Sequence, residues 1–338
     1  MNGLDAKVFS GAAARVNSWK RPLLLTHTNP DGDALGSLAA MRAILQLQGI
    51  EALAVLFDPL PGRYALFSRF EPMPILGVDI SEDGLSGVDG IMVLDTCAYA
   101  QLRPIADWLR AADVPKIAVD HHITRDQLAD AYVIDESAAA NCLILHDWVR
   151  FVAWELDHTA REALFVGIAM DTGWFRHSNT DDRAFSAVAT LASEGVSPHE
   201  LYGRLFHRES PGRIRLLGIA LEGMDLLAEG RLAIMTLDDG AFAKAGAQYA
   251  DTEDIVNEPL RIDSVAAAVL MVARGDGVIR TSFRSKEPLR EGGPDLDVAR
   301  IAQALGGGGH RRAAGARITG ELAAVRQLVA DELQKVLG

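Results

Sequence analysis

Residues 22–36 read PLLLTHTNPDGDALG and place an apolar run, a polar loop and the start of a helical pattern one after another. The apolar run at 22–27 is typical of a buried strand, and residues 34–48 have the spacing of a helix. A second apolar run, EALAVLF, follows at 51–57. The order strand, helix, strand predicts a parallel sheet of the α/β class.

The same alternation continues downstream. GIMVLDT (90–96) and KIAVDHH (116–122) are apolar runs with a helical pattern between them at 102–112. Nearly continuous apolar runs fit parallel strands, because such strands are covered on both faces. Further helices are expected at 4–19, 138–150, 157–170 and 181–194. Together these elements predict an N-terminal α/β domain spanning residues 1–192.

The residue composition and the pattern of predicted elements change after this region. Residues 193–214 contain Gly, Pro and several charges in a partly helical stretch, which indicates a helical linker. Beyond it, 226–237 is typical of a hairpin, and 264–286 of two strands joined through RGDG. Helices are expected near 296–305 and 320–336. We therefore predict a smaller α+β domain at 215–338.

Composition limits the classes of function. The chain has 338 residues, 46 acidic and 33 basic, with a formal net charge of −13. Such a charge argues against a surface for long duplex nucleic acid, so any nucleic-acid partner should be small. Cys97 and Cys142 fit no disulfide framework. The absence of membrane-length apolar runs and of a signal peptide leads us to expect a cytoplasmic protein without membrane partners.

The loop after the first predicted strand contains an imidazole and two carboxylates, from His27, Asp31 and Asp33. Turn-forming Asn, Pro and Gly separate them, so one tight loop can direct all three to the same point. Ligands in open α/β sheets gather at the carboxyl ends of strands, where this loop begins. The alternative is a polar turn that caps the following helix.

Other predicted elements end in the same kinds of residue. One strand runs into Asp95, and another runs into Asp120, His121 and His122. Asp171 follows the apolar helical run ALFVGIAM, where an unpaired buried carboxylate would be costly. This recurrence favours a site over a set of unrelated turns.

Charge balance indicates what the site holds. Asp31, Asp33, Asp95 and Asp171 carry four negative charges, which two divalent cations would neutralise. Without metal, the carboxylates would repel one another and some would bind protons. Oxygen ligands with an imidazole at each ion favour two Mn²⁺, with Mg²⁺, Co²⁺ or zinc as substitutes.

A glycine-rich segment, GGGGHRRAAG at 306–315, follows a predicted helix of the second domain. Its backbone N–H groups could converge on an anion, with His310 and the arginines as further donors. A flexible turn is the alternative. Arg284 lies near the end of a predicted strand, where it would either bind phosphate, stack on a base or remain an exposed edge residue.

Taken together, HTNPDGDALGS, VLDTC, VDHH, MDTGWFRHSNT and GGGGHRRAAG resemble the DHH phosphoesterase family with its DHHA1 domain. The resemblance covers residues from about 21 to 317. The two-domain form is most similar to the stand-alone oligoribonucleases and 3'-phosphoadenosine-5'-phosphate (pAp) phosphatases called nanoRNases. The resemblance implies hydrolysis of short oligoribonucleotides, linear dinucleotides or pAp to mononucleotides.

The resemblance also assigns roles to residues. It implies that one metal ion is held by His27, Asp31 and Asp95, and the other by Asp33, Asp95, His121 and Asp171, so that Asp95 bridges. His122 would act on the scissile phosphate as a positioning or acid group, with Asp120 in support. The terminal phosphate or nucleotide would be held by Arg284, Gly307, Gly308, Gly309 and His310. Met170 and AANCLIL (139–145) depart from the family pattern, which leaves details of substrate binding open.

The sequence leaves alternative functions open. A manganese inorganic pyrophosphatase would share the first domain, but we expect a different second domain in such an enzyme. A RecJ-like exonuclease should carry additional nucleic-acid-binding domains. A nucleotide-binding sensor without turnover would not need a second metal ion. A homodimer is also left open.

Overall fold

The computed structural model describes residues 6–60, 62–69, 72–207, 209–287 and 296–337. The chain divides into two units, Met1–Arg208 (unit 1) and Glu209–Gly338 (unit 2). The division lies inside the stretch 193–214 that we expect to be the linker.

Unit 1 is built on a parallel sheet with the strand order β2-β1-β3-β4-β5. Its strands are β1 (Leu23–Leu25), β2 (Leu53–Ala54), β3 (Ile91–Leu94), β4 (Lys116–Asp120) and β5 (Ala131–Ile134). The parallel α/β fold predicted from the sequence is confirmed.

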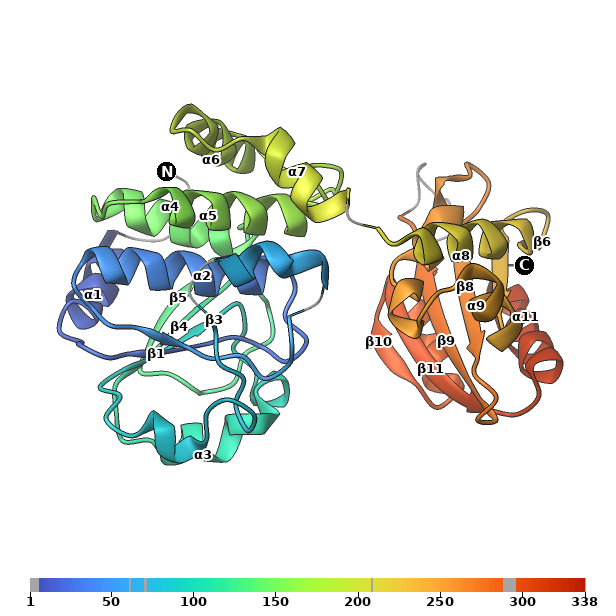
Figure 1. Cartoon of the computed structure of the whole chain (residues 1–338), viewed down its shortest axis with the longest axis horizontal. Coiled ribbons are helices and arrows are strands. Elements are labelled where there is room, and N and C mark those ends of the chain that lie inside the picture. The colour runs from blue at the N-terminus through green and yellow to red at the C-terminus, as the bar shows by residue number, and fades with distance from the viewer. Residues whose placement is uncertain (1–5, 61, 70–71, 208, 288–295, 338) are drawn as a thin grey trace. The chain divides into compact units, whose positions relative to one another are not determined.

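Helices cover both faces of this sheet, as Figure 1 shows for α2, α4 and α5 on one side and α3 on the other. The α-helices of unit 1 are α1 (Ala6–Val16), α2 (Gly32–Leu47), α3 (Ala106–Ala111), α4 (Asn141–Phe151), α5 (His158–Asp171), α6 (Asp182–Ser193) and α7 (Pro198–Phe206). The 3₁₀ helices are η1 (Gly62–Arg69), η2 (Glu82–Leu85), η3 (Tyr99–Gln101) and η4 (Arg103–Ile105).

Successive residues of a strand face opposite sides of the sheet, which gives unit 1 two cores. Leu24 packs with α2, α4 and α5. Leu23 and Leu25 pack with the residues around α3 on the other side. Every residue of β1 and β3 is buried, which explains their continuous apolar sequence.

The structure differs from the sequence-based expectation at three elements of unit 1. The edge strand β5 was not predicted, because its short sequence AYVI gives little periodic signal. β2 covers two residues of the expected 51–57. The helix expected at 102–112 starts as α3 at Ala106, after the 3₁₀ turn that contains Pro104.

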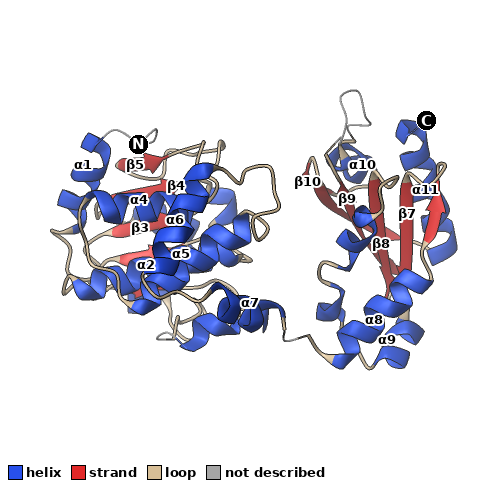
Figure 2. Cartoon of the chain, turned by 90° about the horizontal axis from the view of Figure 1, so that it is seen from above, coloured by secondary structure: helices blue, strands red, loops and turns tan. Residues whose placement is uncertain are grey.

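Unit 2 contains a mixed sheet with the order β10-β11-β9-β8-β7-β6, seen in Figure 2. Its strands are β6 (Asp225–Leu227), β7 (Leu232–Leu237), β8 (Ala267–Ala273), β9 (Val278–Ser285), β10 (Gly308–His310) and β11 (Ala313–Thr319). Its helices are α8 (Pro211–Glu222), α9 (Asp239–Ala245), η5 (Tyr249–Thr252), η6 (Ile255–Arg261), α10 (Val298–Ala304) and α11 (Leu322–Leu337). The predicted hairpin, strand pair and two helices are confirmed.

Two cores also lie on the two faces of the unit 2 sheet. One contains residues of α10 and α11, and the other contains residues of α8, α9 and η6. The glycine-rich segment differs from expectation, because Gly308–His310 forms the edge strand β10 paired with β11. Within the described ranges, we find no helix with the length and apolar character needed to cross a bilayer.

Candidate metal centre

The loops that leave β1, β3 and β4 bring the predicted residues of unit 1 together. His27 lies two residues beyond β1, Asp95 directly follows β3, and His121 directly follows β4. Asp95 has a positive φ of 62°, a conformation that costs energy in most non-glycine residues and is concentrated at functional sites. The backbone therefore turns sharply at the point where its carboxylate is needed.

Asp95 lies at the centre of the group. Its Oδ2 is 3.6 Å from His27 Nε2, and its Oδ1 is 3.4 Å from His121 Nε2. His121 Nε2 is also 3.7 Å from Asp171 Oδ2. Ligand atoms lie within 4.8 Å of one another in the set His27, Asp31 and Asp95, and likewise in the set Asp33, His121 and Asp171.

The backbone orients both central histidines. His27 Nδ1 lies 2.9 Å from the Thr28 carbonyl oxygen, and His121 Nδ1 lies 3.1 Å from that of Ala138. A carbonyl oxygen only accepts, so Nδ1 carries the hydrogen in both rings. Each Nε2 therefore faces the carboxylates, which is the usual orientation of metal-binding histidines.

Two helix N-termini hold the loop carboxylates. Asp31 is the N-cap of α2, and its Oδ1 accepts hydrogen bonds from the amides of Asp33 and Ala34. The capping alternative is thus correct for Asp31 and does not exclude a ligand role. Asp33 is 1% exposed and accepts the amides of Asn141 (2.5 Å) and Cys142 (2.9 Å) at the start of α4.

Asp171 reaches the group from the C-terminal end of α5. The turn after it is held by Asn179, whose Nδ2 donates to the backbone oxygens of Ala139 (3.0 Å) and Asp171 (3.3 Å). His177 Nδ1 lies 3.3 Å from the Asp171 carbonyl oxygen. His177 therefore supports this turn.

Crowding of like charges shifts the pKa values in the metal-free protein. Burial, followed by the charges of Asp95 and Asp171, raises the pKa of Asp33 well above its ordinary value. Burial also raises the pKa of Asp171, to about 6. Burial lowers the pKa of His27 and His121, but the interaction of each imidazole with the adjacent Asp95 carboxylate helps to raise these values to about 9 and about 10.

These residues fit divalent cations by their donor chemistry. Four carboxylates and two imidazoles supply oxygen and nitrogen ligands without a thiolate. Asp95 Oδ1 is buried and has no hydrogen-bond partner among the described residues. A buried carboxylate oxygen of this kind is costly unless a positive group meets it, and a cation would meet it.

His122 and Asp120 form a pair at the edge of the cluster, where His122 Nδ1 lies 3.8 Å from Asp95 Oδ1. Asp120 is fully buried, and its Oδ1 lies 2.7 Å from His122 Nδ1. This hydrogen bond raises the pKa of His122. The His122 side chain is 48% exposed, so part of the ring is accessible to a substrate.

The residues predicted to bind substrate lie together on neighbouring strands of unit 2. Arg284 on β9 is opposite Ala313 on β11, which in turn is opposite His310 on β10. Burial lowers the pKa of Arg284.

The glycines beside His310 have different roles. Gly308 and Gly309 belong to β10. The Gly307 amide donates a hydrogen bond to the Ala302 oxygen, so that amide is already engaged. A Cβ at Gly307 would lie 2.1 Å from the Gly315 oxygen, which explains the glycine.

Some contributors were not found from the sequence. The amides of Asn141 and Cys142 hold Asp33, and the only signal was a helix start without a capping side chain at Ala140. Met170, which departs from the family pattern, packs against the loop, where a Cβ on Gly32 would lie 2.5 Å from its Cγ. Cys97 is buried.

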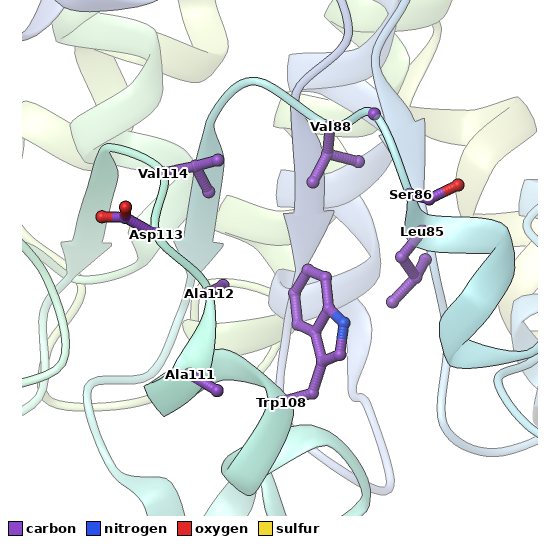
Figure 3. Close-up of a pocket in the computed structure, with 9 residues that line it drawn as sticks. Leu85, Ser86, Val88, Trp108, Ala111, Ala112, Asp113 and Val114 are labelled. Atoms are coloured by element: carbon purple, nitrogen blue, oxygen red, sulfur yellow. The ribbon is translucent and has the colours of Figure 1, made fainter.

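A cavity of about 240 Å³ lies at the other end of the unit 1 sheet (Figure 3). Its lining includes Leu85, Val88, Trp108 and Val114. Residues 85–88 and 111–114 precede β3 and β4, whereas the metal cluster follows these strands. The cavity is therefore separate from the metal centre.

Comparison with known proteins identifies the family. The model of the DHH family N-terminal domain matches residues 22–168, and that of the DHHA1 domain matches 230–336. The bifunctional oligoribonuclease and PAP phosphatase NrnA of Thermus thermophilus is 31% identical over 301 residues, covering 88% of this chain and 84% of that protein. The chain belongs to the DHH family. The resemblance inferred from the five motifs is confirmed, and this DHH protein is a metal-dependent phosphoesterase.

Other proteins are similar to this DHH protein. The Bacillus subtilis protein that is also named bifunctional oligoribonuclease and PAP phosphatase NrnA is 26% identical and covers 88% of each chain. The crystal structure of an exopolyphosphatase-related protein from Bacteroides fragilis matches with a TM-score of 0.89, at 19% identity, over 100% of this chain and 99% of that one. RecJ of Thermus thermophilus in complex with Mn²⁺ matches with a TM-score of 0.51, at 12% identity, over 98% of this chain and 54% of that one. These two structures show a shared fold.

Proposed function

We propose that this DHH protein hydrolyses phosphoester bonds in short oligoribonucleotides, linear dinucleotides and pAp, and releases mononucleotides. The relatives from Thermus thermophilus and Bacillus subtilis are named for oligoribonuclease and PAP phosphatase activity. The observation that carries the proposal is the convergence of four aspartates and two histidines at one edge of the unit 1 sheet.

Two Mn²⁺ ions are the proposed cofactors. One would be held by His27, Asp31 and Asp95, and the other by Asp33, Asp95, His121 and Asp171. The mixed oxygen and imidazole donors favour Mn²⁺, with Mg²⁺ or Co²⁺ as substitutes. When bound, the ions would supply Lewis-acid polarisation of the phosphoryl group.

The protein's own groups would supply proton transfer and orientation. His122, held by Asp120 and with a raised pKa, would carry a proton to the oxygen of the leaving group. Asp120 would keep the ring in place, because its carboxylate only accepts from His122 Nδ1. This division of roles resembles other imidazole and carboxylate pairs in enzymes.

Unit 2 would bind the nucleotide that is not being cleaved. Burial lowers the pKa of Arg284. Within the described part of the chain, no carboxylate is hydrogen-bonded to its guanidinium. A partly buried guanidinium without a hydrogen-bonded carboxylate can still bind an anionic ligand such as phosphate, here against the charge of the nearby Asp254. Gly308, Gly309 and His310 lie on β10, which is separated from Arg284 on β9 by β11.

The other readings receive less support. A pyrophosphatase is disfavoured because unit 2 matches the DHHA1 domain. A sensor without turnover is disfavoured by the complete set of ligands for two ions. The free, buried Cys97 and Cys142 fit the reducing cytoplasm, which we propose as the compartment.

A substrate panel tests this proposal. The purified protein in Mn²⁺ would be offered pAp, linear dinucleotides, pentanucleotide RNA and pyrophosphate under identical conditions. We expect turnover of the first three and none of pyrophosphate. Asp95→Asn should be inactive, whereas Asp107→Asn, which removes an equal charge from a fully exposed position on α3, should be active. Preferential hydrolysis of pyrophosphate would contradict the proposal.

A further inference from the structure

One face of the unit 2 sheet is left open over β11 and β10, beside β9, which η6 partly covers. Along β9, alternate residues are buried, and Ile279 and Phe283 belong to the core that includes α10 and α11. Arg280, Ser282 and Arg284 alternate with them and face the opposite side, which α8, α9 and η6 cover over β7 and β8. On that side His310, Gly315 and Arg317 are exposed. In Figure 1 the ribbons of β10 and β11 lie beside α8 and α9, not under them.

This open face is basic in a chain of strongly negative charge. The strands β9, β10 and β11 contain no aspartate or glutamate. The strand register places Arg284 opposite Ala313, Ser282 opposite Gly315, and Arg280 opposite Arg317. Ala313, Gly315 and Ser282 have small side chains or none. An extended anionic ligand can therefore lie close to the backbone between the charged side chains.

The positive charges form two spots on this face. Arg284 and His310 make the first, which is the substrate site already proposed. Arg280 and Arg317 make the second, four residues along the strands, or roughly 13 Å away at the usual rise of a β-strand. One phosphate group is too small to contact both spots.

The positive charge of the second spot is only partly neutralised by carboxylates of the described residues. Asp276 pairs with Arg280 at 2.8 Å, but no acidic partner of Arg317 is found among the described residues. Like charges directly opposite each other destabilise a sheet, so this arrangement has a cost in the absence of an anion. Arg280 Nη1 is buried and lacks a hydrogen-bond partner within the described ranges.

An aromatic side chain borders the second spot. Tyr249 is 46% exposed, and the Arg280 guanidinium lies 5.6 Å from the centre of its ring. Exposed aromatic rings next to arginines are the usual platform on which proteins stack the bases of single-stranded nucleic acid. Phosphate and base contacts are thus available side by side.

We propose that Arg317, Arg280 and Tyr249 form a second nucleotide subsite, which binds single-stranded RNA beyond the nucleotide held by Arg284 and His310. The inference rests on the proposed function, and it names the substrates that this site selects. RNA longer than a dinucleotide would reach both spots, whereas pAp would reach the first alone. The subsite would therefore favour longer substrates.

Binding experiments with labelled pentanucleotide RNA and labelled pAp test the subsite. They would use the full-length Asp95→Asn protein, so that no turnover is needed. Adding Arg317→Ala should weaken pentanucleotide binding on the order of tenfold more than pAp binding. The slope of log affinity against log salt for the RNA should become shallower by about 0.7, as expected for one lost contact to a single-stranded phosphate. Tyr249→Ala should weaken RNA binding without changing that slope.

Matched variants complete the test. Arg317→Lys should restore most of the RNA affinity, because it keeps the charge. Arg300→Ala, which removes an exposed arginine from α10 on the opposite face, should bind like its parent. Unchanged RNA affinity in Arg317→Ala, or an equal loss for RNA and pAp, would overturn the subsite. Unchanged RNA binding by Arg317→Ala, together with normal turnover of pAp by the protein that retains Asp95, would separate failure of this inference from failure of the proposed function.

Discussion

Asp33 shows how a single residue depends on the site around it. Its carboxylate is buried, faces the charges of Asp95 and Asp171, and accepts two amides from the start of α4. The amides stabilise the ionised form, but burial and like charges raise its pKa. A bound cation would resolve this conflict and keep the carboxylate ionised.

The first prediction concerns His122. His122→Gln removes the proposed acid while Asp120 remains, so we expect kcat to fall roughly 10²- to 10⁴-fold. Metal-induced thermal stabilisation should be retained, because the proposed ligands are intact. His199→Gln, an exposed change on α7, is the control and should match the wild type. Loss of metal binding in His122→Gln would show instead that His122 is a ligand.

The second prediction concerns pH. The folded pKa values of about 9 for His27 and about 10 for His121 lie above the ordinary 6.5. Protonation of His27 and His121 therefore stabilises the metal-free fold, and this stabilisation is fully present below pH 6.5. It is lost as the pH rises through the pKa values that the two imidazoles have in the folded protein. Metal ions need neutral imidazoles, so metal binding competes with these protons.

Calorimetric titration with Mn²⁺ at several pH values checks this competition. The affinity for each ion should rise about tenfold per pH unit for each proton released, up to the range of the raised pKa values. Proton release on binding should be visible as a dependence of the heat on the buffer. An affinity independent of pH between about 6 and 8 would contradict the assignment of the histidines.

At the scale of elements, the crossing of α2 and α5 positions the metal centre. Gly36 and Gly167 lie where the two helices approach closely, and a Cβ on Gly36 would be 2.6 Å from the Ala163 oxygen. A Cβ on Gly167 would lie 2.2 Å from Cys142 Sγ and 2.7 Å from Asp33 Oδ1. Glycine here lets α5 pack directly behind the Asp33 carboxylate.

The third prediction follows from this crossing. Gly167→Ala should lower the free energy of unfolding by roughly 1 to 3 kcal/mol, because the added methyl group overpacks the core. It should also weaken metal binding, since Asp33 must move. The matched control is Gly11→Ala on α1, where a Cβ would meet nothing within 4 Å.

Denaturant unfolding of both variants measures the difference. Gly11→Ala should raise the stability by about 0.5 to 1 kcal/mol, because alanine is the better helix former. If Gly167→Ala is as stable as the wild type and binds metal normally, the close contact of α2 and α5 is not needed for the site.

Much of the architecture was predictable, because buried parallel strands leave long apolar runs and end at functional residues. The loops after β1, β3 and β4 were found in this way. Contacts that depend on distant backbone were not, such as the α4 amides on Asp33 and the Ala138 oxygen on His121. The edge strands β5 and β10 were also missed, because three or four residues carry little periodicity.

At the scale of the whole molecule, each unit has its own hydrophobic cores. Those of unit 1 contain residues up to Leu205, and those of unit 2 begin at Leu216. All six proposed metal ligands lie in unit 1. Metal binding should therefore stabilise unit 1 directly and unit 2 only through any coupling between them.

The fourth prediction uses this separation. Scanning calorimetry should show a transition that moves upward with Mn²⁺, by about 2.7 kcal/mol of stabilisation when the free ion is a hundredfold above its Kd. A second transition, from unit 2, should move little. Chelation should reverse the effect, and a metal that shifts neither transition would argue against binding to the folded aspartate cluster.

The most direct measurement is anomalous diffraction at the manganese edge from crystals grown with Mn²⁺. We expect two peaks about 3.5 to 4 Å apart, as in other two-metal sites, with Asp95 between them. Asp31, Asp33 and Asp171, together with His27 and His121, should complete the coordination. No peak, or a single one, among these side chains in crystals saturated with manganese would contradict it.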